Sequence, residues 1–173
     1  MTRAMLIDIS KCLGCNACTQ ACKMANNIPE GVFRSKIHQH ETGAYPAVSL
    51  TFIKHSCKHC VEPGCASACP VGALYKTADG PVVYDSKKCI GCRYCMNACP
   101  YGVPSFDWDK GLLEAPVINK CTFCVDRDDG GEGPACAEVC PFGAITFGER
   151  DELLAQAHTQ IQNNPERYVD HVY

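Results

Sequence analysis

Residues 88–104 read KCIGCRYCMNACPYGVP, where three cysteines separated by two residues each are followed, three residues later, by a fourth cysteine and a proline. This stretch decides the fold, because all sixteen cysteines of the chain fall into four related groups of four. The groups are Cys12, Cys15, Cys18 and Cys22; Cys57, Cys60, Cys65 and Cys69; Cys89, Cys92, Cys95 and Cys99; and Cys121, Cys124, Cys136 and Cys140. Cysteine groups at such spacings ligate 4Fe–4S clusters through their thiolates. Sixteen thiolates therefore predict four 4Fe–4S clusters.

The composition of the 173-residue chain excludes several classes of protein. Its formal net charge of −3 comes without a basic stripe, which argues against nucleic-acid binding. No run approaches the ~18 apolar residues of a membrane span. A secreted disulfide scaffold is disfavoured, because the cysteines repeat with a metal-site period and residues 1–7 do not read as a signal peptide. We therefore expect a soluble cytoplasmic protein, with export alongside a partner as the alternative.

A repeated pattern surrounds the cysteine groups and indicates duplication. Three groups close with Cys-Pro-x-Gly, at Cys69, Cys99 and Cys140, whereas Lys23 follows Cys22 in the first group. Each group reads as a short strand, a ligand loop, a short helix, a tight turn and another short strand. The strands expected before the groups lie at residues 5–9, 50–53, 81–84 and 115–118. This pattern predicts an α+β fold of two fused bacterial-type ferredoxin modules, each holding two 4Fe–4S clusters.

The spacing between groups indicates how they pair. The second and third groups are separated by a segment with a turn signal at 78–81, which is the layout of one two-cluster ferredoxin. The first and fourth groups must then pair around it. In two-cluster bacterial ferredoxins the fourth cysteine ligates the other cluster. The expected ligand sets are Cys57, Cys60, Cys65 and Cys99; Cys89, Cys92, Cys95 and Cys69; Cys12, Cys15, Cys18 and Cys140; and Cys121, Cys124, Cys136 and Cys22.

The same pairing predicts the domain organisation. We expect an outer discontinuous ferredoxin module, an interface or insert segment, an inner ferredoxin module, and a C-terminal helix with a partner-docking tail. Their ranges are 1–26 with 107–150, 27–52, 53–106 and 151–173. An apolar stripe predicts the helix at 151–164, and the tail beyond it has little chain left to pack on. A β-hairpin is one interpretation of 27–45, and Trp108 is expected to shield a cluster from water.

Four segments of the chain resemble the four-cluster iron–sulfur subunits of respiratory oxidoreductases, such as dimethyl sulfoxide reductase, formate dehydrogenase, polysulfide and tetrathionate reductases, and the corresponding hydrogenase subunit. The resemblance spans roughly residues 5–155, and the segments are CKHC at 57–60, CPVGAL at 69–74, the stretch at 88–104, and KCTFCVDR at 120–127 with CAEVCPFGAITFG at 136–148. It implies a subunit without substrate chemistry of its own.

The resemblance also implies the partners. Such a subunit carries electrons between a molybdenum or tungsten pterin catalytic subunit, or a hydrogenase, and a second redox partner linked to flavin and NAD or to quinone. A cytoplasmic aldehyde oxidoreductase is one such assembly, by analogy alone. End-to-end stacking of copies is left open.

Two other classes compete with this interpretation. A free polyferredoxin would shuttle electrons between enzymes by transient docking. A zinc or disulfide scaffold would use the same cysteines structurally, and His55 and His59 beside Cys57 could join a zinc site. Packing or a hydrogen bond near a cluster is the preferred role for His59.

Overall fold

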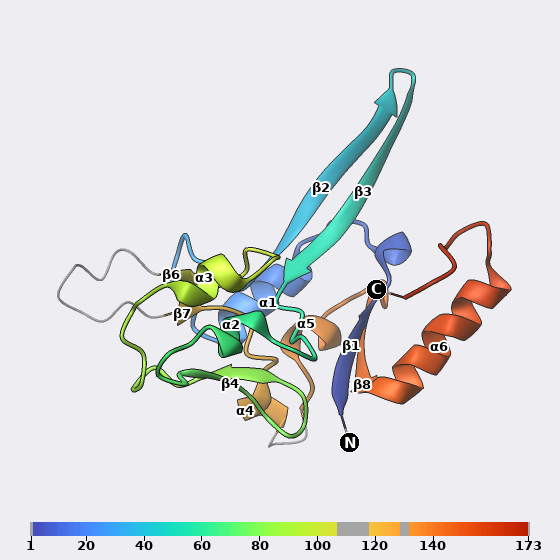
Figure 1. Ribbon diagram of the computed structural model, residues 1–173. Coiled ribbons are helices and arrows are strands. Elements are labelled where there is room, and N and C mark those ends of the chain that lie inside the picture. The colour runs from blue at the N-terminus through green and yellow to red at the C-terminus, as the bar shows by residue number, and fades with distance from the viewer. Residues whose placement is uncertain (1, 107–117, 129–131, 173) are drawn as a thin grey trace.

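The computed structural model describes residues 2–106, 118–128 and 132–172. Short helices and strands surround the cysteine groups, and one long hairpin projects from them (Figure 1). The helical elements are the 3-10 turn η1 (Ile9–Lys11), α1 (Ala17–Ala25), α2 (Gly64–Ser67), α3 (Tyr94–Ala98), α4 (Val125–Asp128), α5 (Ala135–Glu138) and α6 (Arg150–Asn163). The strands are β1 (Arg3–Ile7), β2 (Ser35–Ala44), β3 (Ala47–Ser56), β4 (Leu74–Lys76), β5 (Val82–Tyr84), β6 (Ser105–Phe106), β7 (Ile118–Asn119) and β8 (Ile145–Glu149). This mixed content agrees with the expected α+β class.

The strands of the described residues pair in antiparallel twos: β1 with β8, β2 with β3, β4 with β5, and β6 with β7. The β1–β8 pair joins the two ends of the chain, with Ile7 opposite Ile145 and Arg3 opposite Glu149. This pairing brings the segment before the first cysteine group beside the segment after the fourth group. The β4–β5 pair forms the hairpin expected around the turn at 78–81.

The β2–β3 hairpin is longer than the sequence indicated. Strand β2 lies in the segment where a hairpin was one interpretation, but its partner β3 includes the strand expected at 50–53. Ser35 lies opposite Ser56 at the base, and Ala44 lies opposite Ala47 near the tip. The expected boundary between residues 52 and 53 therefore falls inside a continuous strand rather than in a linker.

Helix α6 packs against the β1–β8 pair, as Figure 1 shows. It confirms the helix predicted at 151–164, within one residue at each end. Leu153 and Ala157 lie four residues apart, so they share one face of the helix, and both are buried. The Glu149 side chain caps the helix by accepting a hydrogen bond from the Asp151 amide.

The chain after α6 returns to its own N-terminal segment. The Arg167 Nε donates to Ser10 Oγ at 2.9 Å, and the Tyr168 hydroxyl donates to Asp8 Oδ2 at 2.8 Å. The expectation that the tail has little of its own chain to pack on is therefore wrong for these two residues. Docking of the tail on a partner remains a prediction.

The residue after the last cysteine decides how each helix ends. Cys99 is extended because Pro100 restricts its backbone, so α3 stops at Ala98. Lys23 replaces the proline in the first group, and α1 continues past Cys22 to Ala25. The departure noted in the sequence thus lengthens one helix.

Cysteines form part of both hydrophobic cores. One core cluster contains Leu74, Cys95, Phe106 and Ile118, and the other contains Cys18, Cys136 and Ile145. The ligand loops are therefore built into the packing rather than attached to it. Trp108 and most of the glycine-rich loop at 129–131 lie outside the described residues. None of the helices within the described ranges combines the length and apolar character needed to cross a membrane.

Candidate metal centre

Each ligand loop turns at the residue before its second cysteine. Gly14, His59, Gly91 and Phe123 occupy this position and all have left-handed backbones, with φ of 71°, 44°, 70° and 62°. This conformation costs a non-glycine residue free energy, so His59 and Phe123 need outside support. The Val82 amide donates to His59 Nδ1 at 3.0 Å, and the rings of His59 and Phe123 lie 4.6 Å apart. The second and fourth loops therefore support each other where the first and third use glycine.

The structure brings the cysteines together in four sets, each containing one cysteine from a second group. We name them tetrads, and their members are Cys12, Cys15, Cys18 and Cys140 in tetrad I; Cys22, Cys121, Cys124 and Cys136 in tetrad II; Cys57, Cys60, Cys65 and Cys99 in tetrad III; and Cys69, Cys89, Cys92 and Cys95 in tetrad IV. Ligation of a cluster by each tetrad remains a prediction.

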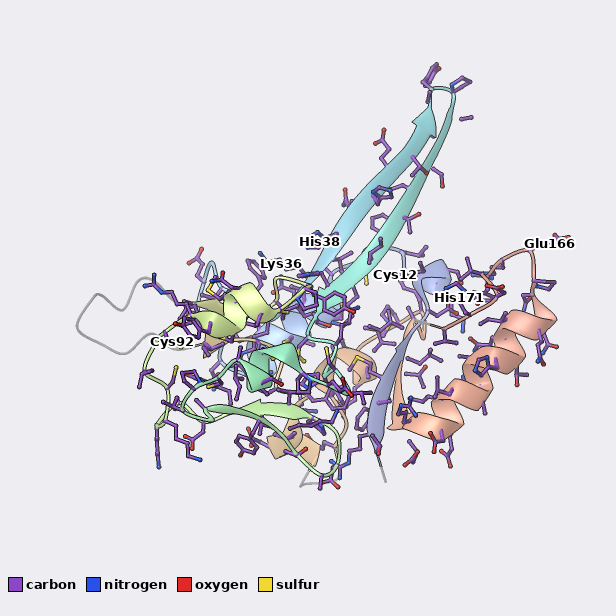
Figure 2. All side chains as sticks on the ribbon, viewed as in Figure 1. Cys12, Lys36, His38, Cys92, Glu166 and His171 are labelled. Carbon is purple, nitrogen blue, oxygen red and sulfur yellow. The ribbon has the colours of Figure 1, made fainter. Side chains whose placement is uncertain are left out.

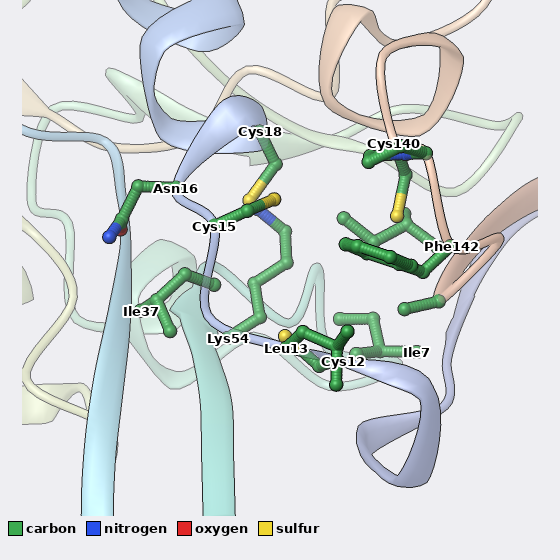
Figure 3. A pocket seen from close by; sticks show the side chains of 13 residues that line it. Ile7, Cys12, Leu13, Cys15, Asn16, Cys18, Ile37, Lys54, Cys140 and Phe142 are labelled. Atoms are coloured by element: carbon green, nitrogen blue, oxygen red, sulfur yellow. The ribbon is translucent and has the colours of Figure 1, made fainter.

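All four sulfurs of tetrad I line one apolar cavity (Figure 3). Cys12, Cys15 and Cys18 come from the first ligand loop and α1, and Cys140 reaches in from the segment after α5. Three apolar side chains and one lysine complete much of the wall: Leu13, Ile37, Phe142 and Lys54. The base of the β2–β3 hairpin, which supplies Ile37 and Lys54, therefore closes this site.

Tetrad IV lines a second cavity, with Cys69 contributed by the segment after α2. Leu74, Phe106 and Ile118 form its apolar floor. The Ala73 amide donates to the Cys69 sulfur at 3.2 Å. Burial raises the pKa of the Cys69 thiol, but backbone hydrogen bonds from residues 71–74 outweigh burial and leave that pKa below its usual value. Amides of this kind stabilise a thiolate.

Tetrads II and III are recognised by the mutual repulsion of their thiolates. Burial raises the pKa of the Cys22 thiol to about 11, and the charges of Cys121 and Cys124 add to the rise. Burial likewise raises the pKa of the Cys136 thiol to about 11, with Cys124 and Cys22 among the contributing charges. In tetrad III, burial raises the pKa of the Cys65 thiol, and its neighbours add their charges: Cys57, Cys99 and Cys60.

The tetrads follow one another in a line. In addition to burial, three contacts between neighbouring tetrads raise the pKa of a cysteine: Cys18 acts on Cys136, Cys57 on Cys121, and Cys65 on Cys95. These contacts connect tetrad I to II, II to III, and III to IV. The order along the molecule is therefore I–II–III–IV, which differs from the order of the groups in the sequence.

The two ends of this line reach the surface. Of the sixteen cysteines, Cys15 and Cys92 are the exposed ones, and they belong to the terminal tetrads I and IV. Figure 2 shows Cys12 of tetrad I and Cys92 of tetrad IV on either side of the hairpin base. The inner tetrads II and III contain no exposed cysteine.

The donor set suits an iron–sulfur cluster. A metal ligand must be a thiolate, and burial opposes that charge, since it raises the pKa of the Cys121 and Cys95 thiols to about 11. Cationic iron compensates for this cost. Within the described ranges, no group of three or more His, Cys, Asp or Glu side chains converges as a single-ion site would require. The cysteines of each tetrad are arranged around a space instead, as the four corners of a cubane need.

Several polar residues at the tetrads were missed by sequence reasoning. Asn26 Nδ2 lies 4.0 Å from the sulfurs of both Cys22 and Cys124, and its Oδ1 accepts a hydrogen bond from Arg34 Nη1 at 3.0 Å. Lys54 and Lys120 are also buried beside tetrads. Asn26 follows the last cysteine of its group by four residues, which places both on one helical face and was a usable signal.

His59 has the packing role expected for it. Burial lowers the pKa of the His59 imidazole to about 3, and the charges of Lys120 and Lys76 add to this effect. The ring is therefore neutral and accepts the Val82 hydrogen bond through Nδ1. His55 instead approaches the Tyr101 carbonyl at 2.8 Å.

Comparison with known proteins agrees with this geometry. Residues 48–150 match the family model of the 4Fe-4S dicluster domain. The chain is 42% identical to the thiosulfate reductase electron transfer subunit of Salmonella typhi, over 88% of this chain and 78% of that protein. It is also 42% identical to a component of the anaerobic dimethyl sulfoxide reductase of Escherichia coli (strain K12), over 85% of this chain and 73% of that protein.

A third relative is a protein of Nitratidesulfovibrio vulgaris that is 41% identical over 98% of this chain. The chain spans half the length of that relative. By the 4Fe-4S dicluster match and these identities, this chain belongs to the 4Fe–4S dicluster family that includes the iron–sulfur subunits of the thiosulfate and dimethyl sulfoxide reductases.

Proposed function

We propose that this chain is the electron-transfer subunit of a larger oxidoreductase and holds four 4Fe–4S clusters, one in each tetrad. The observation that carries the proposal is the line of four cysteine tetrads with an exposed cysteine at each end. The dicluster family and the relative described as an electron transfer subunit support it. No acid, base or nucleophile is assigned to the chain.

The ligand sets follow the four tetrads, and two modules follow from them. The outer module, 1–26 with 107–150, holds tetrads I and II, and the inner module, 53–106, holds tetrads III and IV. The antiparallel β1–β8 pair supports an outer module built from both ends of the chain. The β4–β5 hairpin supports an inner one.

The residues of this chain prepare the sites for one-electron chemistry, which the clusters supply when bound. Burial of the inner cysteines excludes water from tetrads II and III, and the exposed Cys15 and Cys92 give partners access at the ends. Backbone and side-chain donors near the sulfurs, such as the Ala73 amide and Asn26, stabilise negative charge there. Electrons enter near one terminal tetrad and leave near the other.

The partners we assign are a molybdenum or tungsten pterin catalytic subunit and a second redox subunit linked to flavin and NAD or to quinone. The names of the reductase components that resemble this chain support a multi-subunit setting. We place the complex in the cytoplasm and keep a hydrogenase partner, end-to-end stacking and export with a partner as outcomes of the test.

Anaerobic purification of the tagged chain from its native host tests the proposal. We expect about sixteen iron and sixteen acid-labile sulfide per chain, with a catalytic subunit in stoichiometric amount. Recovery of the brown protein as a monomer would favour a free polyferredoxin instead. Colourless protein with stoichiometric zinc would refute electron transfer altogether.

A further inference from the structure

Two lysines are buried among the cysteine tetrads. Lys54 is 3% exposed and Lys120 is 2% exposed, and both carry positive charge at neutral pH. Lysine is almost never fully buried unless an opposite charge lies nearby, because desolvating an ammonium is costly. Within the described residues neither lysine forms an ion pair with a carboxylate. Their compensating charge must come from another source.

Lys54 lies between tetrads I and II. Its side chain enters the cavity of tetrad I, and Figure 3 shows its amino end beside Cys15 and Cys18. Burial raises the pKa of the Cys22 and Cys136 thiols of tetrad II, and the charge of Lys54 partly offsets that rise. Its Nζ donates a hydrogen bond to Ser35 Oγ, which is neutral. Ser35 holds the ammonium in place without neutralising it.

Lys120 occupies the equivalent place between tetrads II and III. Its Nζ donates to the carbonyl oxygens of Val82 and Cys121, the latter at 2.9 Å. Burial raises the pKa of the Cys121 thiol in tetrad II and of the Cys57 thiol in tetrad III, and the charge of Lys120 counteracts both rises. Both hydrogen-bond acceptors are again uncharged.

The sequence context shows that Lys120 is a special case. A lysine precedes the first cysteine in three groups, at Lys11, Lys88 and Lys120. Lys11 and Lys88 are partly exposed, and each pairs with an aspartate three residues earlier, at 3.4 and 3.6 Å. The corresponding residue before Lys120 is Val117, which cannot form an ion pair.

We propose that Lys54 and Lys120 are positioning residues whose charges are balanced by the clusters and raise the reduction potentials of the clusters beside them. This inference rests on the proposed function. A cubane bound by four thiolates is an anion that gains one negative charge on reduction, so a nearby fixed cation favours the reduced form. The effect is strong at these sites because few water molecules screen it.

The positions of the lysines predict a pattern across the four clusters. Lys54 should affect tetrads I and II, and Lys120 should affect tetrads II and III. Neither lysine lines the cavity of tetrad IV. Removing each charge in turn should therefore lower two potentials, with one cluster responding to both changes and one to neither.

The test uses Lys54→Met and Lys120→Met, which keep the length and apolar stem of lysine but remove the charge. Lys36→Met is the matched control, because Lys36 lies on β2 of the same hairpin but is exposed. Midpoint potentials are measured by redox titration of the anaerobic holoprotein, followed by electron paramagnetic resonance. We expect the two-by-two pattern of more negative potentials, with no shift in Lys36→Met. Unchanged potentials, or an equal shift of all four, would overturn the proposal.

Iron and sulfide analysis separates this proposal from the proposed function. A wild-type protein without clusters refutes both, whereas loaded variants with wild-type potentials refute only the role of the lysines. If Lys54→Met fails to retain iron, Lys54→Arg decides the question. Retention of iron by the arginine variant shows that the charge is required, and equal loss from both variants assigns Lys54 a packing role and overturns the proposal.

Discussion

Replacing Gly14 by alanine should loosen the contact between the first ligand loop and the β2–β3 hairpin. Gly14 has φ of +71°, and an added methyl would overlap the ring of Phe52, with the ring carbon Cγ only 2.9 Å away. Phe52 and Lys54 share one face of β3, because side chains alternate along a strand. Displacing Phe52 therefore also disturbs the wall of the tetrad I cavity.

The cost has two parts that a control variant can separate. A left-handed backbone costs a residue with a side chain about 1–2 kcal/mol. Forcing a methyl into packed surroundings costs about 1–3 kcal/mol more. Gly31→Ala provides the control, because Gly31 has a similar φ of +78° but nothing within 4 Å of the added carbon. Gly14→Ala should therefore cost about 1–3 kcal/mol more than Gly31→Ala.

The assay is the rate of unfolding in urea under anaerobic conditions, followed by loss of visible absorbance. If the contact is broken in the transition state, Gly14→Ala should unfold roughly 5- to 150-fold faster than Gly31→Ala. Adding Phe52→Ala removes the overlap, so Gly14→Ala should then cost no more than the control. Equal rates for the two glycine variants would refute the reasoning, as would a Gly14→Ala cost that persists without the Phe52 ring.

Three further predictions concern the tail and the tetrads. Tyr168→Phe removes a hydrogen bond to the buried Asp8 carboxylate, worth roughly 1.5–3 kcal/mol, and should speed amide hydrogen exchange in the tail. Burial raises the pKa of Asp8, but its hydrogen bonds outweigh burial and leave that pKa below the usual value. A depressed carboxyl pKa stabilises the fold above about pH 3.9 and is lost only as pH falls through the folded value, so tail protection should stay constant from about pH 7 to 5. Asn26→Leu removes an amide donor from two sulfurs and should lower the midpoint potential of the tetrad II cluster. Cys140→Ser should disturb the spectrum of the tetrad I cluster and leave tetrad II unchanged.

Each of these changes has a matched control. Tyr45→Phe removes a hydroxyl from a tyrosine that is 93% exposed at the hairpin tip, and it should not affect tail exchange. Asn163→Leu changes an exposed asparagine on α6 and should leave every potential unchanged. Cys22→Ser is the reciprocal of Cys140→Ser and should disturb tetrad II. Loss of tail protection between pH 7 and 5, an unchanged potential in Asn26→Leu, or the same cluster affected by both serine variants would contradict the respective predictions.

Much of the local structure could be predicted because its causes are local. The α6 stripe of apolar residues repeats with the period of a helix, and the turn at 78–81 joins two short strands, so both were found. The strand at 50–53 was also found, but its partner β2 and its full length were not, because nothing in one strand specifies the register of the other. The anchoring of Tyr168 on Asp8 joins residues 160 positions apart and left no sequence signal.

The sequence by itself determined the kind of site: sixteen cysteines at short, repeated spacings specify thiolate ligands for iron and a set of similar loops around them. Only the tertiary structure decided the linear order of the tetrads, the exposure of Cys15 and Cys92 at its ends, and the burial of Lys54 and Lys120 at its inner junctions. The physical reason is that ligand spacing acts over a few bonds, whereas burial and charge depend on which distant segments meet. The same Lys-Cys pair is an exposed ion-pairing site at Lys11 and Lys88 but a buried cation at Lys120.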